Sequence, residues 1–134
     1  MWLQATLTAG YPLLTRLPDS VVGTTTEQDA GGGALFALVP IRPGAEEYLL
    51  KTGVLGPAGE PECVTLDGDR VVIAACDVGR QQQIVTLRGN GPPFKVLVGG
   101  RALSVTQAEV RAVAPGSGTP LTFIVRGTAQ DPFG

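Results

Sequence analysis

The segment from Cys63 to Leu87, CVTLDGDRVVIAACDVGRQQQIVTL, decides the fold of this chain. It contains three short runs that are rich in Val, Ile and Thr: Cys63–Leu66, Val71–Cys76 and Gln82–Leu87. Turn-type residues separate the runs, Asp67-Gly68-Asp69 among them. Short β-branched runs bounded by Gly and Asp are typical of β-strands. The segment therefore predicts short paired strands, and it shows no helical period.

Similar runs recur along the chain. The run Val71–Cys76 matches two others, which are Ala34–Pro40 and Glu109–Pro115. Within these three runs Ala37, Ala74 and Ala112 align, at intervals of 37 and 38 residues. A second set of runs ends in Gly53, Gly89 and Gly127, at intervals of 36 and 38 residues. A repeat of this length indicates an architecture built from similar supersecondary units.

The repeat predicts an all-β fold, a β-trefoil with three pseudo-repeats of four short strands. Closing three such units around an axis removes exposed sheet edges and gives one core. We expect one domain over residues 1–134, with units at about 10–53, 54–89 and 90–127. The first nine residues precede these units, and we expect them to form or extend an edge. A sandwich is the alternative, but it would not require a threefold repeat.

The composition argues against an enzyme. The 134 residues include 19 Gly and 11 Pro, a density that a helical bundle would not tolerate. There are two Cys and no His, so neither a Ser-His-Asp nor a Cys-His catalytic unit can be built. The same shortage excludes a conventional zinc site. We predict a non-enzymatic protein without a cofactor or a metal.

The charge pattern excludes further partners. The formal net charge is −2 and the arginines are scattered, so we expect no nucleic-acid binding. No apolar run approaches the length of a membrane span, so we expect no membrane partner. The first residues, Met1–Thr8, lack the basic start and long apolar stretch of a signal peptide. These features predict a cytoplasmic protein, and release by a non-classical route stays open.

The second predicted unit resembles the ricin-B-type β-trefoil unit, on the three runs quoted above. The resemblance implies a lectin, with a disulfide between the two cysteines and a Gln-x-Trp motif in the third run. Val85, or Ile84 in the neighbouring frame, stands at the Trp position. The sugar-binding Asp of that family is replaced by Thr65, and Gly23 and Ser104 stand at the matching places in the other units. The aromatic platform is also missing, so a glycan-binding lectin is the second hypothesis.

The sequence leaves two alternatives open for the redox state of the two cysteines. A bridge between Cys63 and Cys76 would close a short loop and stabilise the fold by about 2–3 kcal/mol. In a reducing cytoplasm, two buried thiols are an equal expectation.

The chain also resembles the mushroom β-trefoil protease inhibitors of the cospin and mycocypin type. The resembling stretches cover most of the chain, and they are Gly10–Leu14, Val22–Asp29, Phe36–Pro40, Pro43–Lys51, Leu66–Val72 and Thr106–Arg111. This resemblance implies a fungal, intracellular protein that inserts a loop into the cleft of a serine or cysteine protease. Inhibition of a protease is the leading hypothesis.

In these inhibitors the reactive loop follows the second strand of the first unit, which here corresponds to Thr24–Gly33. The proposed binding residues are Thr24, Thr25, Thr26, Glu27, Gln28 and Asp29. A trypsin inhibitor needs Arg or Lys in this loop, and none is present. Arg16 with Leu17, and Arg80, are the alternative loop residues, since the arginines are expected to be exposed.

Overall fold

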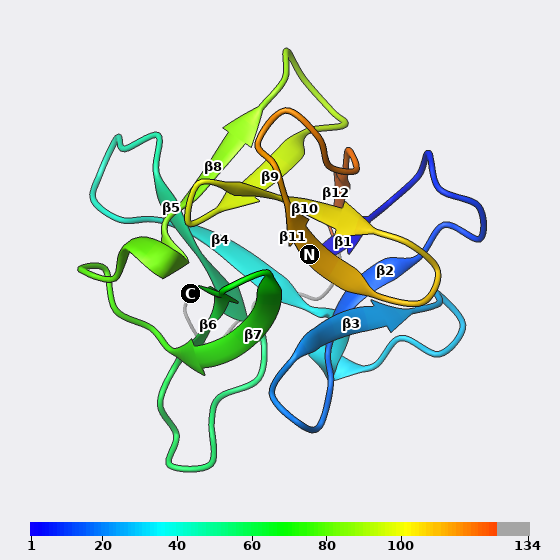
Figure 1. Cartoon of the computed structure of the whole chain (residues 1–134). Coiled ribbons are helices and arrows are strands. Elements are labelled where there is room, and N and C mark those ends of the chain that lie inside the picture. The colour runs from blue at the N-terminus through cyan, green and yellow to red at the C-terminus, as the bar shows by residue number, and fades with distance from the viewer. Residues whose placement is uncertain (126–134) are drawn as a thin grey trace.

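The computed structural model describes residues 1–125 (Figure 1). Its strands are β1 (Trp2–Gln4), β2 (Leu13–Arg16), β3 (Val22–Thr25), β4 (Phe36–Pro40), β5 (Tyr48–Thr52), β6 (Glu62–Asp67), β7 (Arg70–Ala75), β8 (Val85–Arg88), β9 (Lys95–Val98), β10 (Arg101–Val105), β11 (Val110–Val113) and β12 (Thr122–Ile124). The helices in this part of the chain are two single 3₁₀ turns, η1 (Gly32–Ala34) and η2 (Gln81–Gln83). The regular structure is therefore β, as the short apolar runs predict.

Six of the strands close into a ring. The antiparallel pairs β1–β12, β4–β5 and β8–β9 form three of its sides. A pairing between Tyr48 and Val85 joins β5 to β8, and a bridge between Phe94 and Leu121 joins the segments of β9 and β12. The backbone of Met1 exchanges hydrogen bonds with Phe36 and connects β1 to β4. The ring leaves no long unpaired edge within residues 1–125.

Three hairpins, β2–β3, β6–β7 and β10–β11, cover one end of the ring (Figure 1). The tip of each hairpin contacts the second strand of the next. The N–H of Ile73 donates to Ser20 O at 2.8 Å, and the N–H of Ala112 donates to Asp69 O at 3.0 Å. The hydroxyl of Thr24 completes the circle by donating to Gln107 O at 2.9 Å. A closed ring with three docked hairpins is a β-trefoil, and the predicted fold is confirmed.

The core fills the ring and the underside of the hairpins. Its fully buried members come from all parts of the described chain and include Leu3, Leu14, Leu50, Val64, Val85, Leu103 and Leu121. Apolar side chains from so many strands can meet only in one common interior, so the hairpins and the ring share a core.

Two details differ from the repeat found in the sequence. Residues 2–4 do not extend an edge, because β1 pairs with both β12 and β2. Ala37 lies on the ring strand β4, whereas Ala74 and Ala112 lie on the hairpin strands β7 and β11. The unit boundaries at about 10–53, 54–89 and 90–127 stay a proposal. The last boundary, with Gly127, falls outside the described residues.

No helix within residues 1–125 has the length and apolar character needed to cross a membrane.

Candidate binding site

The predicted loop residues Thr24–Asp29 begin on a strand and end in a turn. Thr24 and Thr25 are the last residues of β3 and pair with Leu14 and Leu13 of β2. Thr26 and Asp29 then close the turn: the N–H of Asp29 donates to the Thr26 hydroxyl at 3.1 Å, and that hydroxyl lies 3.2 Å from Asp29 Oδ2. Local bonds of this kind are the reason why Thr and Asp favour turns. The turn is therefore ordered by its own side chains.

These residues form one wall of a hollow on the surface, of about 420 Å³, which we call the first hollow. It is lined by Gly10, Pro12, Thr24, Thr25, Thr26, Asp29 and Gln107. Glu27 and Gln28 are exposed and are not among these lining residues. The structure therefore brings together four of the six predicted loop residues and adds others from two distant segments.

Gln107 holds those segments together. Its side-chain amide donates to Ala9 O at 2.8 Å, while its backbone carbonyl accepts from Thr24. Gly10 permits this approach, because it has φ +82° and a Cβ there would lie 2.7 Å from the Gln107 amide nitrogen. The turn between β10 and β11 is thus held against both the loop between β1 and β2 and strand β3.

Tyr11 lies between Gly10 and Pro12 in the sequence, and these two residues line the first hollow, although Tyr11 is not itself one of the lining residues. It is 59% exposed and has φ 49°, an unusual value for a residue with a side chain. Gln4 donates to its carbonyl at 3.0 Å and holds this backbone. Tyr11, Gly10 and Gln107 are not among the binding residues predicted from the sequence. A lone aromatic residue next to glycine in a turn was the available signal for Tyr11, whereas only the docking of the hairpins could reveal Gln107.

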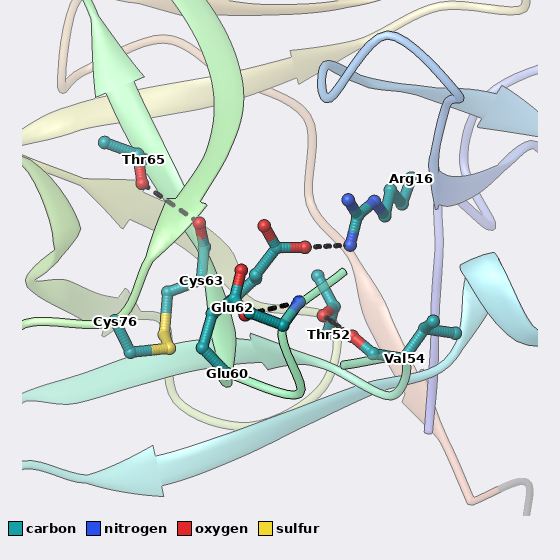
Figure 2. A network of polar contacts seen from close by, with 9 residues as sticks. Arg16, Thr52, Val54, Glu60, Glu62, Cys63, Thr65 and Cys76 are labelled. Carbon is teal, nitrogen blue, oxygen red and sulfur yellow. Dashed lines mark hydrogen bonds and ion pairs between the residues drawn. A yellow bond between two sulfur atoms is a disulfide. The ribbon is translucent and has the colours of Figure 1, made fainter. Parts of the chain in front are cut away.

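The alternative loop residues lie elsewhere. Arg16 forms an ion pair with Glu62 of β6, and its side chain is 18% exposed, so it is not the exposed residue expected (Figure 2). The neighbouring Leu17 is half-buried and packs over Gly23, where a Cβ would clash with it. Arg80 is exposed at the start of η2 and does not line the first hollow.

The ricin-B-like positions of the second unit form a structural network. Gln83 is fully buried: it donates to the Thr65 hydroxyl at 3.0 Å and to Ala75 O at 2.8 Å, and it accepts from Asp77 N at 2.7 Å. Thr65 in turn donates to Cys63 O (Figure 2). Among the three glutamines Gln81–Gln83, Gln83 is the buried one, and Val85 follows it by two residues. Thr65 is fully buried and its hydroxyl is bonded within this network, so it cannot contact a sugar.

Cys63 and Cys76 form a disulfide between β6 and the residue after β7 (Figure 2). Disulfides form and persist in oxidising compartments and are rare in the cytoplasm. The prediction of a cytoplasmic protein is therefore wrong, and the bond indicates an extracellular one. The alternative of two free thiols does not hold, and spacing alone could not exclude it, because spacing does not fix the redox state of two cysteines.

No group of Cys, Asp and Glu side chains in residues 1–125 is arranged to hold a metal ion. The first hollow offers hydroxyl, amide and carboxylate groups, and none of its lining residues is cationic. Such a set suits a neutral ligand that is rich in hydroxyl groups, since each of these side chains can pair with a hydroxyl as donor or acceptor.

No protein-family model matches the chain, and no curated protein is similar to it in sequence. Solved structures do share its fold. The structure of the Haemophilus ducreyi cytolethal distending toxin superposes with a TM-score of 0.65 at 16% identity, over 87% of this chain and 81% of that one. Cry35Ab1 superposes with a TM-score of 0.62 at 13% identity, over 90% of this chain but 36% of its own. At these identities the likeness concerns the fold.

The described residues form a β-trefoil, and the two solved structures share this fold.

Proposed function

We propose that this β-trefoil binds a neutral glycan in the first hollow. The observation that carries the proposal is the polar lining of this hollow, and the exposed Tyr11 is the chain neighbour of two of its lining residues. Binding sites of this kind combine a few precisely placed polar groups with an apolar or aromatic surface. Tyr11 supplies an aromatic ring with a polar tip, which can cover the apolar face of a sugar ring.

The polar groups of the first hollow match sugar hydroxyls. Asp29 uses one carboxylate oxygen in its turn, and its Oδ1 makes no hydrogen bond to the described residues. The Thr25 hydroxyl likewise makes none within that part of the chain. Both groups are therefore available to a ligand. A hydrogen bond to a charged group contributes about 1.5–3 kcal/mol, so Asp29 is the residue we expect to dominate recognition.

Protease inhibition gains less support. The turn at Thr26–Asp29 is closed on itself by hydrogen bonds, and the loop carries no Arg or Lys for an acidic specificity pocket. The comparisons support neither a mushroom inhibitor nor a fungal origin. The ricin-B resemblance of the second unit and the disulfide favour an extracellular partner, and glycans are such partners.

A glycan array followed by calorimetry on the selected glycan tests the proposal. We expect Asp29→Asn to weaken binding at least about tenfold, which corresponds to roughly 1.4 kcal/mol. Asp19→Asn is the matched control, because Asp19 is an exposed turn residue outside the first hollow. Tyr11→Ala should weaken binding as well, whereas Leu7→Ala, on the same loop, should not.

The competing result is equally clear. Stoichiometric inhibition of trypsin, chymotrypsin, subtilisin or papain, together with a blank array, would overturn the glycan proposal. So would a selected glycan whose affinity falls equally in the Asp29 and Asp19 variants.

A further inference from the structure

Two cations face each other on the β8–β9 hairpin. The register places Arg88, the last residue of β8, directly opposite Lys95, the first residue of β9. Residues opposite each other in an antiparallel pair project from the same face of the sheet. Like charges directly opposite each other destabilise a hairpin. The presence of two cations at these positions is therefore not explained by the stability of the hairpin.

Neither cation has a carboxylate partner among residues 1–125. Lys95 donates to the carbonyl of Gly116 at 3.3 Å, and Arg88 is exposed. In the same part of the chain, Arg16 pairs with Glu62 and Arg111 pairs with Asp69. Arg88 and Lys95 thus combine adjacent positive charges with unused donors. This is the arrangement that oxyanions prefer, because guanidinium and ammonium groups donate charge-assisted hydrogen bonds to them.

Arg88 and Lys95 line a hollow of about 370 Å³ on the surface, which we call the second hollow. Its other walls come from the tip of the β8–β9 hairpin and from the connection after β11, which lie side by side in Figure 1. Three prolines, Pro93, Pro115 and Pro120, supply rigid apolar surfaces there, and none of the lining residues is acidic. Rigid walls need little ordering on binding.

We propose that the second hollow binds the sulfate group of a sulfated glycan. Arg88 and Lys95 would hold the sulfate oxygens, and the proline rings would contact the apolar face of the sugar that carries it. The apolar lining favours a sugar ester over a free ion, because inorganic sulfate would leave those surfaces without a contact. The chain as a whole has a net charge of −2, so attraction to a polyanion must come from this local patch. The proposal does not depend on the first hollow.

Calorimetry on the intact, disulfide-bonded chain tests this site. The probe is a heparin-derived hexasaccharide, and its desulfated counterpart is the reference. We expect the sulfated probe to bind at least tenfold more tightly than the desulfated one, and the difference to shrink as salt rises. Arg88→Gln with Lys95→Gln should weaken the sulfated probe at least tenfold.

A matched double variant controls for net charge. Arg42→Gln with Arg70→Gln removes the same two charges from exposed positions outside the second hollow, and we expect less than a twofold loss. Equal losses in the two double variants would overturn the proposal. It is also overturned if the sulfated and desulfated probes bind alike, if inorganic sulfate binds as tightly as the hexasaccharide, or if only vesicles with anionic lipids bind.

Two further readouts separate this site from the first hollow and from misfolding. Asp29→Asn should leave binding of the sulfated probe unchanged, so each hollow can fail alone. Arg88→Gln should raise the Tm, because it removes the like charge opposite Lys95 in the strand register. If the double variant loses both the probe and its cooperative melt, Arg88→Gln alone replaces it, and a loss of affinity is expected together with the rise in Tm.

Discussion

Gln83 is the residue through which the loop before β8 is attached to the β6–β7 hairpin. Its amide bonds to the Thr65 side chain and the Ala75 carbonyl, and its carbonyl accepts from Asp77. All three partners belong to the segment that the disulfide encloses or adjoins. A buried amide with every partner in place orders its surroundings strongly, because any unpaired group in the same position would be costly.

Replacing this amide should destabilise the whole domain. We expect Gln83→Ala to lower the free energy of unfolding by roughly 2–4 kcal/mol, because it leaves several buried polar groups without partners and opens a cavity. Urea denaturation followed by circular dichroism measures the change. Gln82→Ala is the matched control on the same 3₁₀ turn: Gln82 is exposed, so its loss should stay within about 0.5 kcal/mol. Equal effects of the two substitutions would contradict the network.

Single residues also mark the limit of what the sequence could tell. Thr24–Asp29 was predicted as a surface loop with binding residues, and four of its residues do line a hollow. Arg16 was expected to be exposed, but its partner Glu62 lies 46 residues further along the chain. Gln107, which lines the first hollow, donates to Ala9 O, and these two residues are 98 positions apart in the sequence. Contacts of such separation depend on how the hairpins dock, and local pattern carries no information on that.

The β6–β7 hairpin is the best-secured element of the fold. It is paired along its full length from Glu62 to Ala75, and the disulfide joins Cys63 to Cys76 across its open end. Its tip also docks on β11, through the bond from Ala112 to Asp69. A crosslink at this place limits the unfolded chain without adding to the native contacts.

Removing the crosslink should therefore cost stability while leaving the fold intact. We expect Cys63→Ala with Cys76→Ala to lower the free energy of unfolding by about 3 kcal/mol, the chain-entropy value for a loop of this length. Reductant should bring the wild-type protein to a similar urea midpoint and should not affect the variant. An unchanged midpoint of the wild-type protein under reductant would contradict the assignment of the bond.

At the scale of strands, composition and turn residues predicted most of what forms. Short β-branched runs between Gly, Pro and Asp were predicted as strands, and the all-β trefoil is confirmed. The alignment of Ala37 with Ala74 and Ala112 nevertheless joins a ring strand to two hairpin strands. Every unit of a trefoil contains several short strands with similar apolar patterns. The spacing of the runs therefore predicts the length of the repeat, but it does not predict which run becomes a ring strand and which becomes a hairpin strand.

The whole molecule depends on closure of the ring, and β1 is the strand that closes it. β1 pairs with β12 in register from Trp2–Ile124 to Gln4–Thr122, and its Leu3 is fully buried in the core. The amino group of Met1 donates to Phe36 O at 2.8 Å and ties the same strand to β4. Three residues thus connect the two ends of the described chain, and their pairings have a long sequence separation.

Disrupting β1 should therefore affect the entire domain rather than one end of it. We expect Leu3→Ala to lower the free energy of unfolding by about 2–5 kcal/mol, because it removes a fully buried side chain and leaves a cavity next to β12. Leu7→Ala is the control, since Leu7 is 72% exposed and should change stability by less than about 0.5 kcal/mol. Urea denaturation measures both changes.

Hydrogen exchange should show faster opening in all three hairpins of the Leu3 variant, because one core joins them to the ring. Faster exchange confined to β1 and β12 would instead mean that the ring opens locally, and that the hairpins hold the core without it.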